Sequence, residues 1–273
     1  MAEPDILVIG AGPAGLAAGH RLQEHGRDEW LILETGDTVG GLARSYTVDG
    51  YTFDIGGHVL FSRDQDFLAL LDRLLGGEHT TIRREAWVHT SGRHVRYPFQ
   101  NHLGGLDPQV THECLAGLVA ARLAAAAGTA GRPENFHDWV HLTFGAGIAR
   151  HFMLPYNAKV WAAPAEHLTY DWISDRVAEV DLDTVLRNVV LRVDDAPWGP
   201  NSTFRYPLRG GTGRLWQRMA EPLADRIRLR CPVVRVDTGT HRLQTSDGRW
   251  RRYERLLSTM PLDEFIAACT DAP

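Results

Sequence analysis

The sequence predicts an α/β fold in which a Rossmann-type domain is split by an inserted, mainly helical domain. Two observations carry this prediction: a strand–glycine–helix unit opens the chain, and short strands return near its end after a helical middle. Strands that alternate with helices in this way are typical of a parallel sheet. We expect the first part of the split domain over residues 1–76, the insert over 77–202, and a second, incomplete part over 203–273.

The opening unit has the pattern of a dinucleotide-binding turn. The apolar run Asp5–Ile9 has the length and β-branched content of a buried strand, and Leu16–His25 reads as a helix. Between them lies a G-x-G-x-x-G motif, formed by Gly10, Gly12 and Gly15. Such glycines allow a tight turn, close approach of the backbone to a pyrophosphate, and close helix–strand packing. The positive end of the helix then faces the phosphates.

An acidic residue follows at the distance that this kind of site requires. A second apolar strand, Trp30–Leu33, ends at Glu34, nineteen residues after Gly15. At this place an acid accepts hydrogen bonds from the adenosine ribose. The glycine motif alone is weak, but with the strand, the helix and the acid it predicts dinucleotide binding.

Two further glycine pairs favour FAD over a nicotinamide cofactor. Gly40 and Gly41 follow Glu34 closely, and Gly56 and Gly57 stand directly before His58. A nicotinamide cofactor needs one glycine fingerprint, whereas an extended FAD needs more backbone without side chains. The alternative is that both pairs are ordinary turns, since Gly-Gly commonly marks a loop.

Composition restricts the class of protein. The chain of 273 residues is 44% hydrophobic and 23% charged, which is typical of a soluble globular protein. Its net charge of −5 argues against a nucleic-acid or acidic-membrane surface. Three cysteines show no metal-ligand spacing, so we predict no metal site and a reducing compartment. The amino terminus shows no secretory signal, and no stretch is long and apolar enough to span a bilayer, so we expect a cytoplasmic enzyme.

The remaining elements follow from apolar periodicity and from glycine and proline positions. Phe67–Leu75 has helical spacing and stops at Gly76–Gly77, and Trp87–Val95 reads as a hairpin. We expect helices over Thr111–Ala127, Phe136–Thr143, Ile148–Leu154, Asp181–Val189 and Leu215–Leu223, and strands over Val233–Asp237, Arg242–Thr245 and Leu256–Thr259.

Three segments of the middle mix aromatic rings, amides and proline in an unusual way. They are Tyr97–Asn101, Phe152–Trp161 and Trp198–Pro207. Aromatic faces beside amides and an occasional arginine suit a planar base joined to a hydroxylated sugar. The alternative is that each cluster fixes a turn to the core.

These motifs carry a resemblance to a known family. In chain order, GAGPAGL, GGLA, DIGGHVLFS, YPFQN, FMLPYNAKVW, WGPNSTFRYP, RGGTG and STM resemble the UDP-galactopyranose mutases of the eukaryotic type. The resemblance covers essentially the whole chain. More distantly the chain is similar to the monoamine oxidase and protoporphyrinogen oxidase superfamily, which shares the opening motif and the split domain.

The resemblance implies an FAD-dependent isomerase that interconverts UDP-galactopyranose and UDP-galactofuranose. In this family N5 of the reduced flavin attacks the anomeric carbon and expels UDP, without net redox change. It implies FAD in its reduced form as the cofactor, with NADPH or NADH as a candidate reductant.

The resemblance also implies roles for individual residues. His58 lies beside the flavin near N5, and Val233 meets the adenine through its backbone. The cofactor is further held by Gly10, Gly12, Gly15, Glu34, Gly40, Gly41, Gly56 and Gly57. Arg176 binds the diphosphate and acts in catalysis; its alternative is a surface ion pair with Asp175. The substrate is bound by Tyr97, Gln100, Phe152, Asn157, Trp161, Arg176 and Asn201.

One departure from the family concerns length. Members continue beyond the position of Pro273, and the missing part supplies a second diphosphate arginine, tyrosines over the sugar and a late glycine-rich segment. We therefore expect a fragment, a truncated gene product or half of a two-chain enzyme. The expected partners are a UDP-sugar and a second copy or a complementing second chain. Three hypotheses remain: an active mutase, a redox flavoenzyme related to the amine oxidases, and a non-catalytic remnant.

Overall fold

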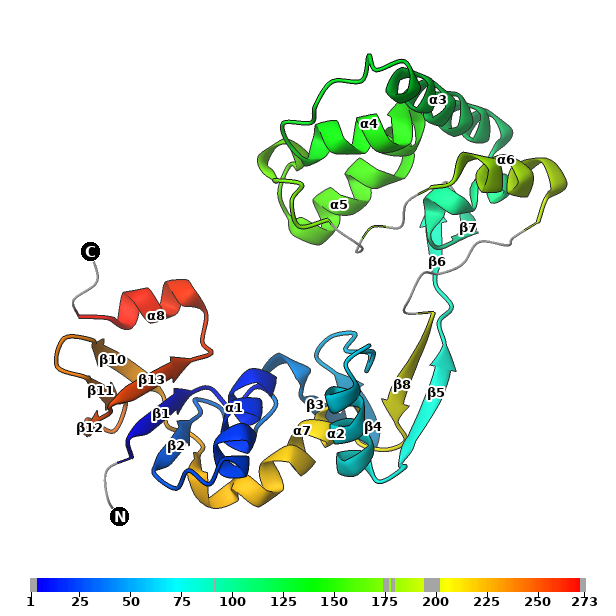
Figure 1. Ribbon diagram of the computed structural model, residues 1–273. Coiled ribbons are helices and arrows are strands. Elements are labelled where there is room, and N and C mark those ends of the chain that lie inside the picture. Colours follow the sequence, from blue (N-terminus) through cyan, green and yellow to red (C-terminus); the bar gives the residue numbers. More distant parts are fainter. Residues whose placement is uncertain (1–3, 91, 174–176, 178–179, 194–201, 271–273) are drawn as a thin grey trace. The chain divides into compact units, whose positions relative to one another are not determined.

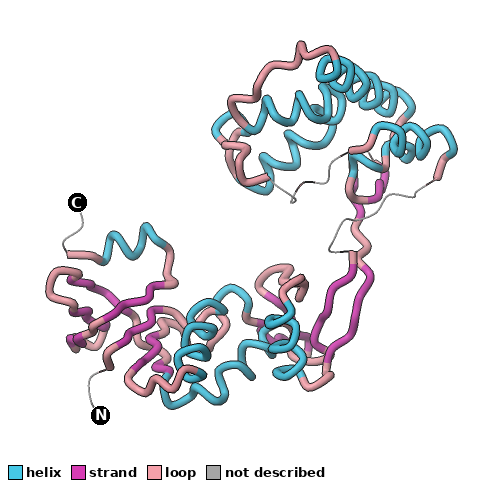
Figure 2. Tube along the Cα trace, in the orientation of Figure 1, coloured by secondary structure: helices cyan, strands magenta, loops and turns pink. Residues whose placement is uncertain are grey.

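The chain divides into two compact units. The computed structural model describes residues 4–90, 92–173, 177, 180–193 and 202–270. Unit 1 comprises Met1–Ile82 and Phe204–Pro273, and unit 2 comprises Arg83–Thr203. Unit 1 mixes short strands with helices, whereas helices predominate in unit 2 (Figures 1 and 2). Among the described residues, no helix is long and apolar enough to cross a membrane.

Unit 1 contains a four-stranded parallel sheet, with β13, β1 and β2 labelled in Figure 1. Its strands lie in the order β13-β1-β2-β9, with bounds Arg255–Ser258 for β13, Ile6–Ile9 for β1, Trp30–Leu33 for β2 and Ile227–Arg228 for β9. Every pairing is parallel, so the carboxyl ends of β1, β2 and β13 meet at one edge. Both faces of such a sheet must be covered, which explains the nearly continuous apolar runs in these strands.

Different elements cover the two faces of this sheet. On one face, Val8 and Ile32 contact helix α1 (Pro13–Glu24) through Leu16 and helix α7 (Gly213–Ala220) through Met219. On the other face, Leu7 and Leu33 form a cluster with residues of a second, antiparallel sheet. That sheet consists of β10 (Val233–Asp237), β11 (Arg242–Thr245) and β12 (Trp250–Arg252), and helix α8 (Leu262–Ala268) contacts β10.

The remaining elements of unit 1 connect its two sheets to the segments that lead into unit 2 and back from it. Strands β3 (Ser45–Val48) and β4 (Tyr51–Asp54) form a hairpin, followed by helix α2 (Gln65–Leu75). The two-stranded sheet of β5 (His79–Arg83) and β8 (Thr203–Pro207) follows. Helix α2 begins at Asp64, whose carboxylate accepts a hydrogen bond from the Phe67 N–H, and ends where Gly76 adopts a left-handed φ of 57°.

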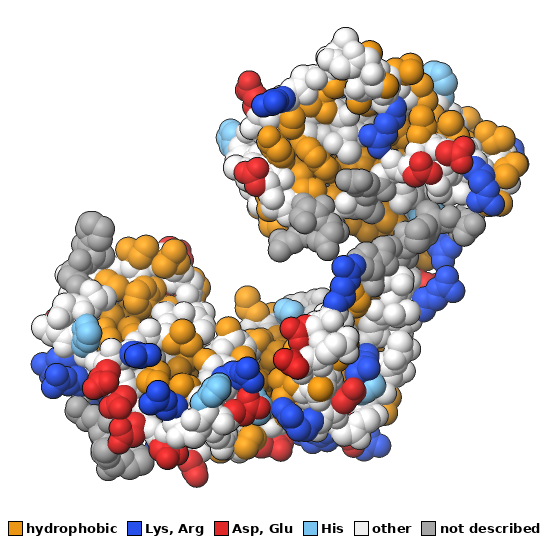
Figure 3. All heavy atoms as spheres, in the orientation of Figure 1, with side chains coloured by type: hydrophobic (Ala, Val, Ile, Leu, Met, Phe, Trp, Pro, Cys, Tyr) orange, Lys and Arg blue, Asp and Glu red, His pale blue; other side chains and the backbone are white. Residues whose placement is uncertain are grey.

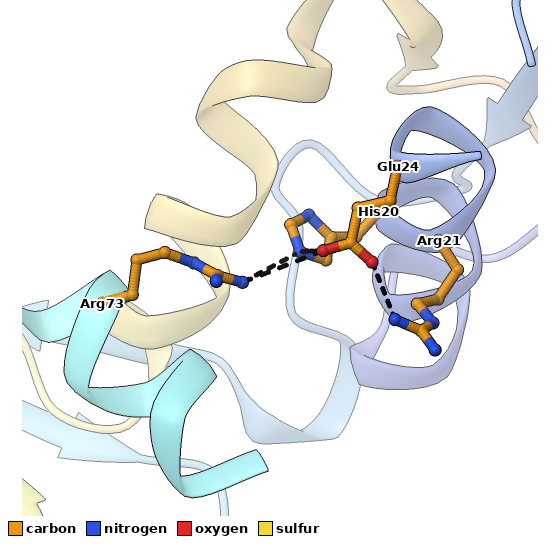
Figure 4. A network of polar contacts seen from close by, with 4 residues as sticks. All are labelled: His20, Arg21, Glu24 and Arg73. Carbon is orange, nitrogen blue, oxygen red and sulfur yellow. Dashed lines mark hydrogen bonds and ion pairs between the residues drawn. The ribbon is translucent and has the colours of Figure 1, made fainter. Parts of the chain in front are cut away.

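Charged side chains also connect the first two helices (Figure 4). The Glu24 carboxylate lies 2.9 Å from the Arg21 guanidinium and 3.2 Å from the imidazole of His20. Arg73 of α2 approaches the same carboxylate at 3.9 Å. The hydrogen bond from Arg21 lowers the pKa of Glu24, which is exposed to solvent. The network therefore orients the ends of α1 and α2 and contributes little to stability.

Unit 2 is a helical body with one hairpin. Strands β6 (Trp87–Thr90) and β7 (Arg93–Arg96) form the predicted hairpin. Its helices are α3 (Pro108–Ala126), α4 (Phe136–Ile148), α5 (Leu154–Trp161) and α6 (Leu182–Leu191). The core is a single large apolar cluster around Phe99, Phe136 and Phe144. In Figure 3, apolar side chains also gather on the face of this unit that is turned to the viewer.

Helices α3 and α4 approach each other through glycines. Gly117 of α3 lies against the backbone of α4 at Gly145, where a φ of 75° interrupts the helix. A Cβ atom on Gly147 would collide with the Glu113 carbonyl oxygen and would lie 2.6 Å from the Cys114 Cα atom. Alpha helix gives way to a π-helical segment at Ala149–Met153, directly after this contact. The close approach therefore fixes where the aromatic segment that follows lies.

We expect Gly147→Ala to destabilise unit 2 by about 1–3 kcal/mol. The added methyl group would collide with backbone atoms of Glu113 and Cys114, which cannot move aside as the end of a flexible side chain can. Urea unfolding followed by tryptophan fluorescence measures the change. Gly131→Ala is the matched control, since a Cβ atom at Gly131 meets nothing within 4 Å. Equal free energies of unfolding for the two variants would contradict the close contact between α3 and α4.

Candidate functional site

The glycine motif forms a turn at the carboxyl end of β1. The Gly10 N–H donates to the Leu33 carbonyl oxygen at 2.8 Å, and Gly10 has a φ of 97° that favours glycine. A Cβ atom on Gly15 would collide with the Gly10 carbonyl oxygen. Gly12 caps α1 and Pro13 opens it, three residues earlier than predicted, since proline suits the first helical position. The first turn of α1 thus presents N–H groups without intrahelical acceptors.

The second glycine pair lies directly on this turn. The Gly40 N–H donates to the Ala11 carbonyl oxygen at 2.8 Å, and a Cβ atom on Gly41 would lie 3.1 Å from the Gly12 Cα atom. Gly40 and Gly41 have φ values of 105° and 53°, so this turn requires residues that tolerate positive φ. The structure therefore brings together two glycine segments that the sequence places some thirty residues apart.

Glu34 closes the same cradle. Its Oε2 accepts a hydrogen bond from the Ala11 N–H at 2.6 Å, and its Oε1 accepts one from the Gly36 N–H at 2.7 Å. A carboxylate oxygen has two lone pairs, so each can accept a further hydrogen bond from a hydroxyl group. The same strand end is tied to the returning chain, because the Cys231 N–H donates to the Glu34 carbonyl oxygen at 2.8 Å. Val233 begins β10 two residues later, which places it near the acid.

Arg44 is a cation near this cradle to which the sequence analysis assigned no role. A Cβ atom on Gly40 would lie 3.1 Å from the Arg44 Cβ atom, and one on Gly36 would lie 3.5 Å from the Arg44 Nη1 atom. A guanidinium group favours an anionic ligand, so Arg44 adds positive charge to this part of unit 1.

A second polar centre forms around Asp54, at the end of β4. Its Oδ1 accepts hydrogen bonds from the Ser45 hydroxyl at 2.5 Å and from the Thr212 N–H at 3.1 Å. Its Oδ2 accepts one from the Tyr206 hydroxyl at 2.6 Å. The Ser45 oxygen in turn accepts from the Gly213 N–H at 2.8 Å. We call these residues the Asp54 centre: Ser45, Asp54, Tyr206, Thr212 and Gly213.

Opposing effects act on the pKa values of this centre. Burial raises the pKa of Asp54, but the hydrogen bonds from Ser45, Tyr206 and Thr212 outweigh it and hold the pKa below its usual value. Burial, together with the hydrogen bond to Asp54, raises the pKa of Tyr206 to about 12. The centre therefore combines an ionised carboxylate with a neutral phenol at neutral pH.

His58 follows on the loop that leaves β4. Its Nδ1 lies 3.1 Å from the Gly56 carbonyl oxygen, and its backbone N–H donates to the same oxygen at 2.8 Å. Since a carbonyl oxygen only accepts, Nδ1 is the donor in this contact, which leaves Nε2 for another partner. Beyond the loop, Leu60 and Arg205 exchange backbone hydrogen bonds of 3.2 and 3.0 Å. The loop is thus fixed at both ends, by Asp54 and by the Leu60 bridge.

The predicted aromatic residues of unit 2 come together around Phe152 of the π-helical segment. The Phe152 ring stacks on Phe99 with centroids 4.6 Å apart and on Tyr156 with centroids 4.9 Å apart. Tyr97 contacts both Phe152 and Tyr156 with centroids 6.4 Å apart. Exposure rises along this stack, from 0% for Phe99 and 5% for Phe152 to 39% for Tyr156. Burial, with Tyr156 nearby, raises the pKa of Tyr97.

The predicted amides lie next to this stack. Gln100 is buried in a 3-10 turn, Phe99–Asn101. Asn157 is buried in α5, where its Nδ2 donates to the Met153 carbonyl oxygen at 2.8 Å and its Oδ1 accepts from the Trp161 Nε1 at 3.2 Å. Trp161 is exposed and lies edge-on to Trp172. The sequence analysis did not single out Tyr156, which is the exposed end of the stack. Its position inside the aromatic segment Phe152–Trp161 is the feature that could have identified it.

Arg176 and Asn201 lie outside the described residues, and their roles stay predictions. Within the part of the chain that the structure describes, no group of three or more His, Cys, Asp or Glu side chains is placed to hold a metal ion. Cys114 is buried, and burial raises the pKa of its thiol to about 12.

The high pKa of Tyr206 predicts how stability depends on pH. An unfolded tyrosine has a pKa of about 10, so the neutral phenol contributes stability below that pH, and the contribution is lost as the pH rises toward 12. We expect the free energy of unfolding of the wild-type chain to fall more steeply between pH 10 and 12 than that of Tyr206→Phe. Urea unfolding at a series of pH values measures both. The two curves should run parallel below pH 9, and parallel curves up to pH 12 would contradict the shift.

Comparisons with known proteins agree on the class of protein. Residues 13–266 match the flavin containing amine oxidoreductase family. The chain is similar to a crystal structure of reduced UDP-galactopyranose mutase, with a TM-score of 0.92, 39% identity, and coverage of 99% of this chain and 58% of that one. It shares its fold with a putrescine oxidase bound to putrescine, with a TM-score of 0.58 at 23% identity, over 94% of this chain and 58% of that one.

A sequence relative points to the same family. The chain is 46% identical over 141 residues to the putrescine oxidase of Kocuria rosea. This aligned segment covers 51% of this chain and 28% of that protein. The chain thus spans less than two thirds of each of these proteins. The predicted fold class and resemblance are confirmed by the structural match. The chain belongs to the family of flavin-containing amine oxidoreductases.

Proposed function

We propose that this chain carries the FAD and nucleotide-sugar sites of a UDP-galactopyranose mutase-like isomerase. The observation that carries the proposal is the similarity to the reduced mutase, which extends over 99% of the chain and therefore over both units. The similarity to the putrescine oxidase structure, at 23% identity, supports the fold alone. A flavin enzyme of this kind interconverts UDP-galactopyranose and UDP-galactofuranose.

The residues of unit 1 fit an FAD. The cradle of Gly12 and Gly41 leaves backbone that no side chain covers, which is what a pyrophosphate beside a helix amino terminus needs. Glu34 has lone pairs left for ribose hydroxyl groups, and Arg44 lies close enough to add positive charge. The segment at Val233 would meet the adenine. When bound in its reduced form, FAD would supply a nucleophilic nitrogen, N5, toward the anomeric carbon of the sugar.

His58 is the group of unit 1 that can hold a proton next to this cofactor. Its Nδ1–H is fixed on the Gly56 carbonyl oxygen, so Nε2 is the atom that accepts or returns a proton. Gly56 and Gly57 place two residues without side chains directly before His58. We therefore assign His58 the role of setting the protonation state of the flavin.

The residues of unit 2 fit a uridine nucleotide. Tyr97 and Tyr156 present partly exposed rings on a buried support of Phe99 and Phe152, and such rings can stack on a uracil. Gln100 would add hydrogen bonds to the base, and Trp161, which donates a hydrogen bond to Asn157, would contact the sugar. Arg176 and Asn201 would bind the diphosphate and the sugar hydroxyl groups. NADPH or NADH would act as reductant.

An anaerobic assay tests the proposal. The purified chain is incubated with FAD, dithionite and UDP-galactofuranose, and UDP-galactopyranose is followed by chromatography. We expect conversion with reduced FAD and none with oxidised FAD, and NADPH and NADH can replace dithionite in parallel samples. The amine-oxidase alternative predicts hydrogen peroxide from putrescine and oxygen without any reductant. Peroxide formation, or bound reduced flavin without conversion, would count against the mutase.

A single methyl group tests the assignment of the cradle. A Cβ atom on Gly12 would meet its neighbour Gly41 at 3.8 Å, an ordinary contact, so the protein itself tolerates Gly12→Ala. We expect the free energy of unfolding to stay within about 0.5 kcal/mol of the wild type. The methyl group would occupy the place of the pyrophosphate, so the dissociation constant for FAD should rise at least about tenfold, which is about 1.4 kcal/mol.

Gly19→Ala on the same helix is the control for this measurement. Its Cβ atom would lie 2.9 Å from the Ile32 Cδ1 atom and 3.0 Å from the Trp30 ring, so it lowers stability through packing of α1 on the sheet. Flavin fluorescence titration should show normal FAD affinity for this folded variant. Weaker FAD binding by Gly19→Ala, together with unchanged FAD binding by Gly12→Ala, would contradict the assignment of the glycine cradle as the pyrophosphate site.

A further inference from the structure

Four segments of unit 1 converge on one carboxylate. Asp54 ends β4, Ser45 begins β3, Tyr206 lies in β8 and Thr212 precedes α7. All three partners donate hydrogen bonds to Asp54, at 2.5 to 3.1 Å. Tyr206 and Thr212 lie 152 and 158 residues away along the chain. The returning chain thus gives two hydrogen bonds to this one side chain of the first eighty residues.

The approach of these segments leaves no room for side chains. A Cβ atom on Gly211, at a φ of 61°, would collide with Asp54 Oδ1 and Ser45 Oγ. A Cβ atom on Gly213 would lie 2.9 Å from Ser45 Oγ and 3.2 Å from the Arg44 carbonyl carbon. The Gly-Gly-Thr-Gly turn is therefore seated directly on residues 44–45, with its N–H groups aimed at the Asp54 centre.

The Asp54 centre lies between the two halves of the proposed flavin site. On one side, Ser45 follows Arg44, whose Cβ contacts the Gly40 position of the cradle. On the other side, the loop of Gly56, Gly57 and His58 leaves directly from Asp54, and the Ile55 N–H donates to the Arg44 carbonyl oxygen at 3.3 Å. A shift of the carboxylate would move both the cradle and the histidine loop.

We propose that Asp54 is the positioning residue of the flavin site, which sets the His58 loop against the glycine cradle through the Asp54 centre. The inference rests on the proposed place of FAD in unit 1 and does not depend on which reaction the flavin performs. Asp54 acts through the backbone of its neighbours and the turn at Thr212. It is the ionised carboxylate that accepts from all three donors at once.

Two substitutions at Asp54 distinguish shape from hydrogen bonding. Asp54→Ala removes every acceptor and leaves the Ser45 hydroxyl, the Thr212 N–H and the Tyr206 hydroxyl without their partner. Asp54→Asn keeps an acceptor oxygen for Ser45 and Thr212 and turns its amide toward Tyr206, whose hydroxyl can accept. We expect Asp54→Ala to raise the dissociation constant for FAD at least about tenfold and to change the visible circular dichroism of bound flavin. Asp54→Asn should restore most of both.

Val236→Ala serves as the stability control. Val236 is fully buried in β10, in the cluster on the opposite side of the sheet, so its truncation destabilises unit 1 without touching the Asp54 centre. Its flavin spectrum should equal that of the wild type. Hydrogen exchange of the chain without added flavin gives an independent readout. In Asp54→Ala, faster exchange should concentrate at residues 55–58 and 211–213, whereas in Val236→Ala it should appear in β10.

Each outcome decides the inference separately from the mutase assay. A flavin spectrum and FAD affinity of Asp54→Ala equal to those of Val236→Ala would overturn it, as would exchange changes spread evenly over unit 1. Failure of the wild-type chain to bind FAD would also overturn it. A perturbed flavin in Asp54→Ala, together with no mutase turnover in the wild type, would uphold the positioning role and remove the proposed reaction alone.

Discussion

The hydrogen bonds of the Asp54 carboxylate are the constraint on which unit 1 depends, because they join segments that the chain separates by more than 150 residues. A split domain must be closed by contacts between its first and last parts. Here the closure has a packed component, in which β13 pairs with β1, and a polar component at Asp54. A charge that is partly buried needs its donors, so a substitution that removes one of them leaves the Asp54 carboxylate with an unsatisfied oxygen. The geometry is therefore set jointly by β3, β8 and the turn before α7.

Close backbone contacts are the second constraint, and they explain the glycines better than local turn chemistry does. Gly12 and Gly41 meet almost Cα to Cα, and Gly15 lies on the carbonyl group of Gly10. In unit 2, Gly117 and Gly147 serve the same purpose between two helices. The first set leaves polar backbone facing outward at a helix terminus, whereas the second buries it between α3 and α4. Glycines thus allow a turn without side chains at a helix terminus in one unit and close helix packing in the other.

Local pattern predicts the parts of this fold that local interactions determine. The strand Ile6–Ile9, the helix after it and Glu34 follow from periodicity and spacing, and so does the end of α2 at Gly76. The hairpin of β3 and β4 was missed although its signal was present: Asp49 and Gly50 both have positive φ, as an Asp-Gly turn between strands predicts. Helix α5 was missed because its aromatic residues and Pro155 resemble a turn, yet proline is tolerated in a first helical turn. The partners of Asp54 could not be predicted, since nothing in the local sequence of Tyr206 or Thr212 indicates which distant carboxylate they meet.

The residues of unit 2 distinguish the proposed reaction from its alternative, because the proposed site of unit 1 would serve any bound flavin. The roles proposed for the glycine cradle, for Glu34 and for His58 suit an oxidase and an isomerase equally well. Aromatic rings suit both a base and an amine cation, since a ring face attracts positive charge as well as a planar heterocycle. What differs is the rest of the lining: an amine needs acceptors or negative charge, whereas a nucleotide needs donors and flat surface. Close in sequence to Tyr97 and Tyr156 stand the buried amides Gln100 and Asn157, and Arg84 lowers the pKa that burial raises at Tyr97. Rings and amides with a nearby cation support the proposed anionic nucleotide rather than a cationic amine.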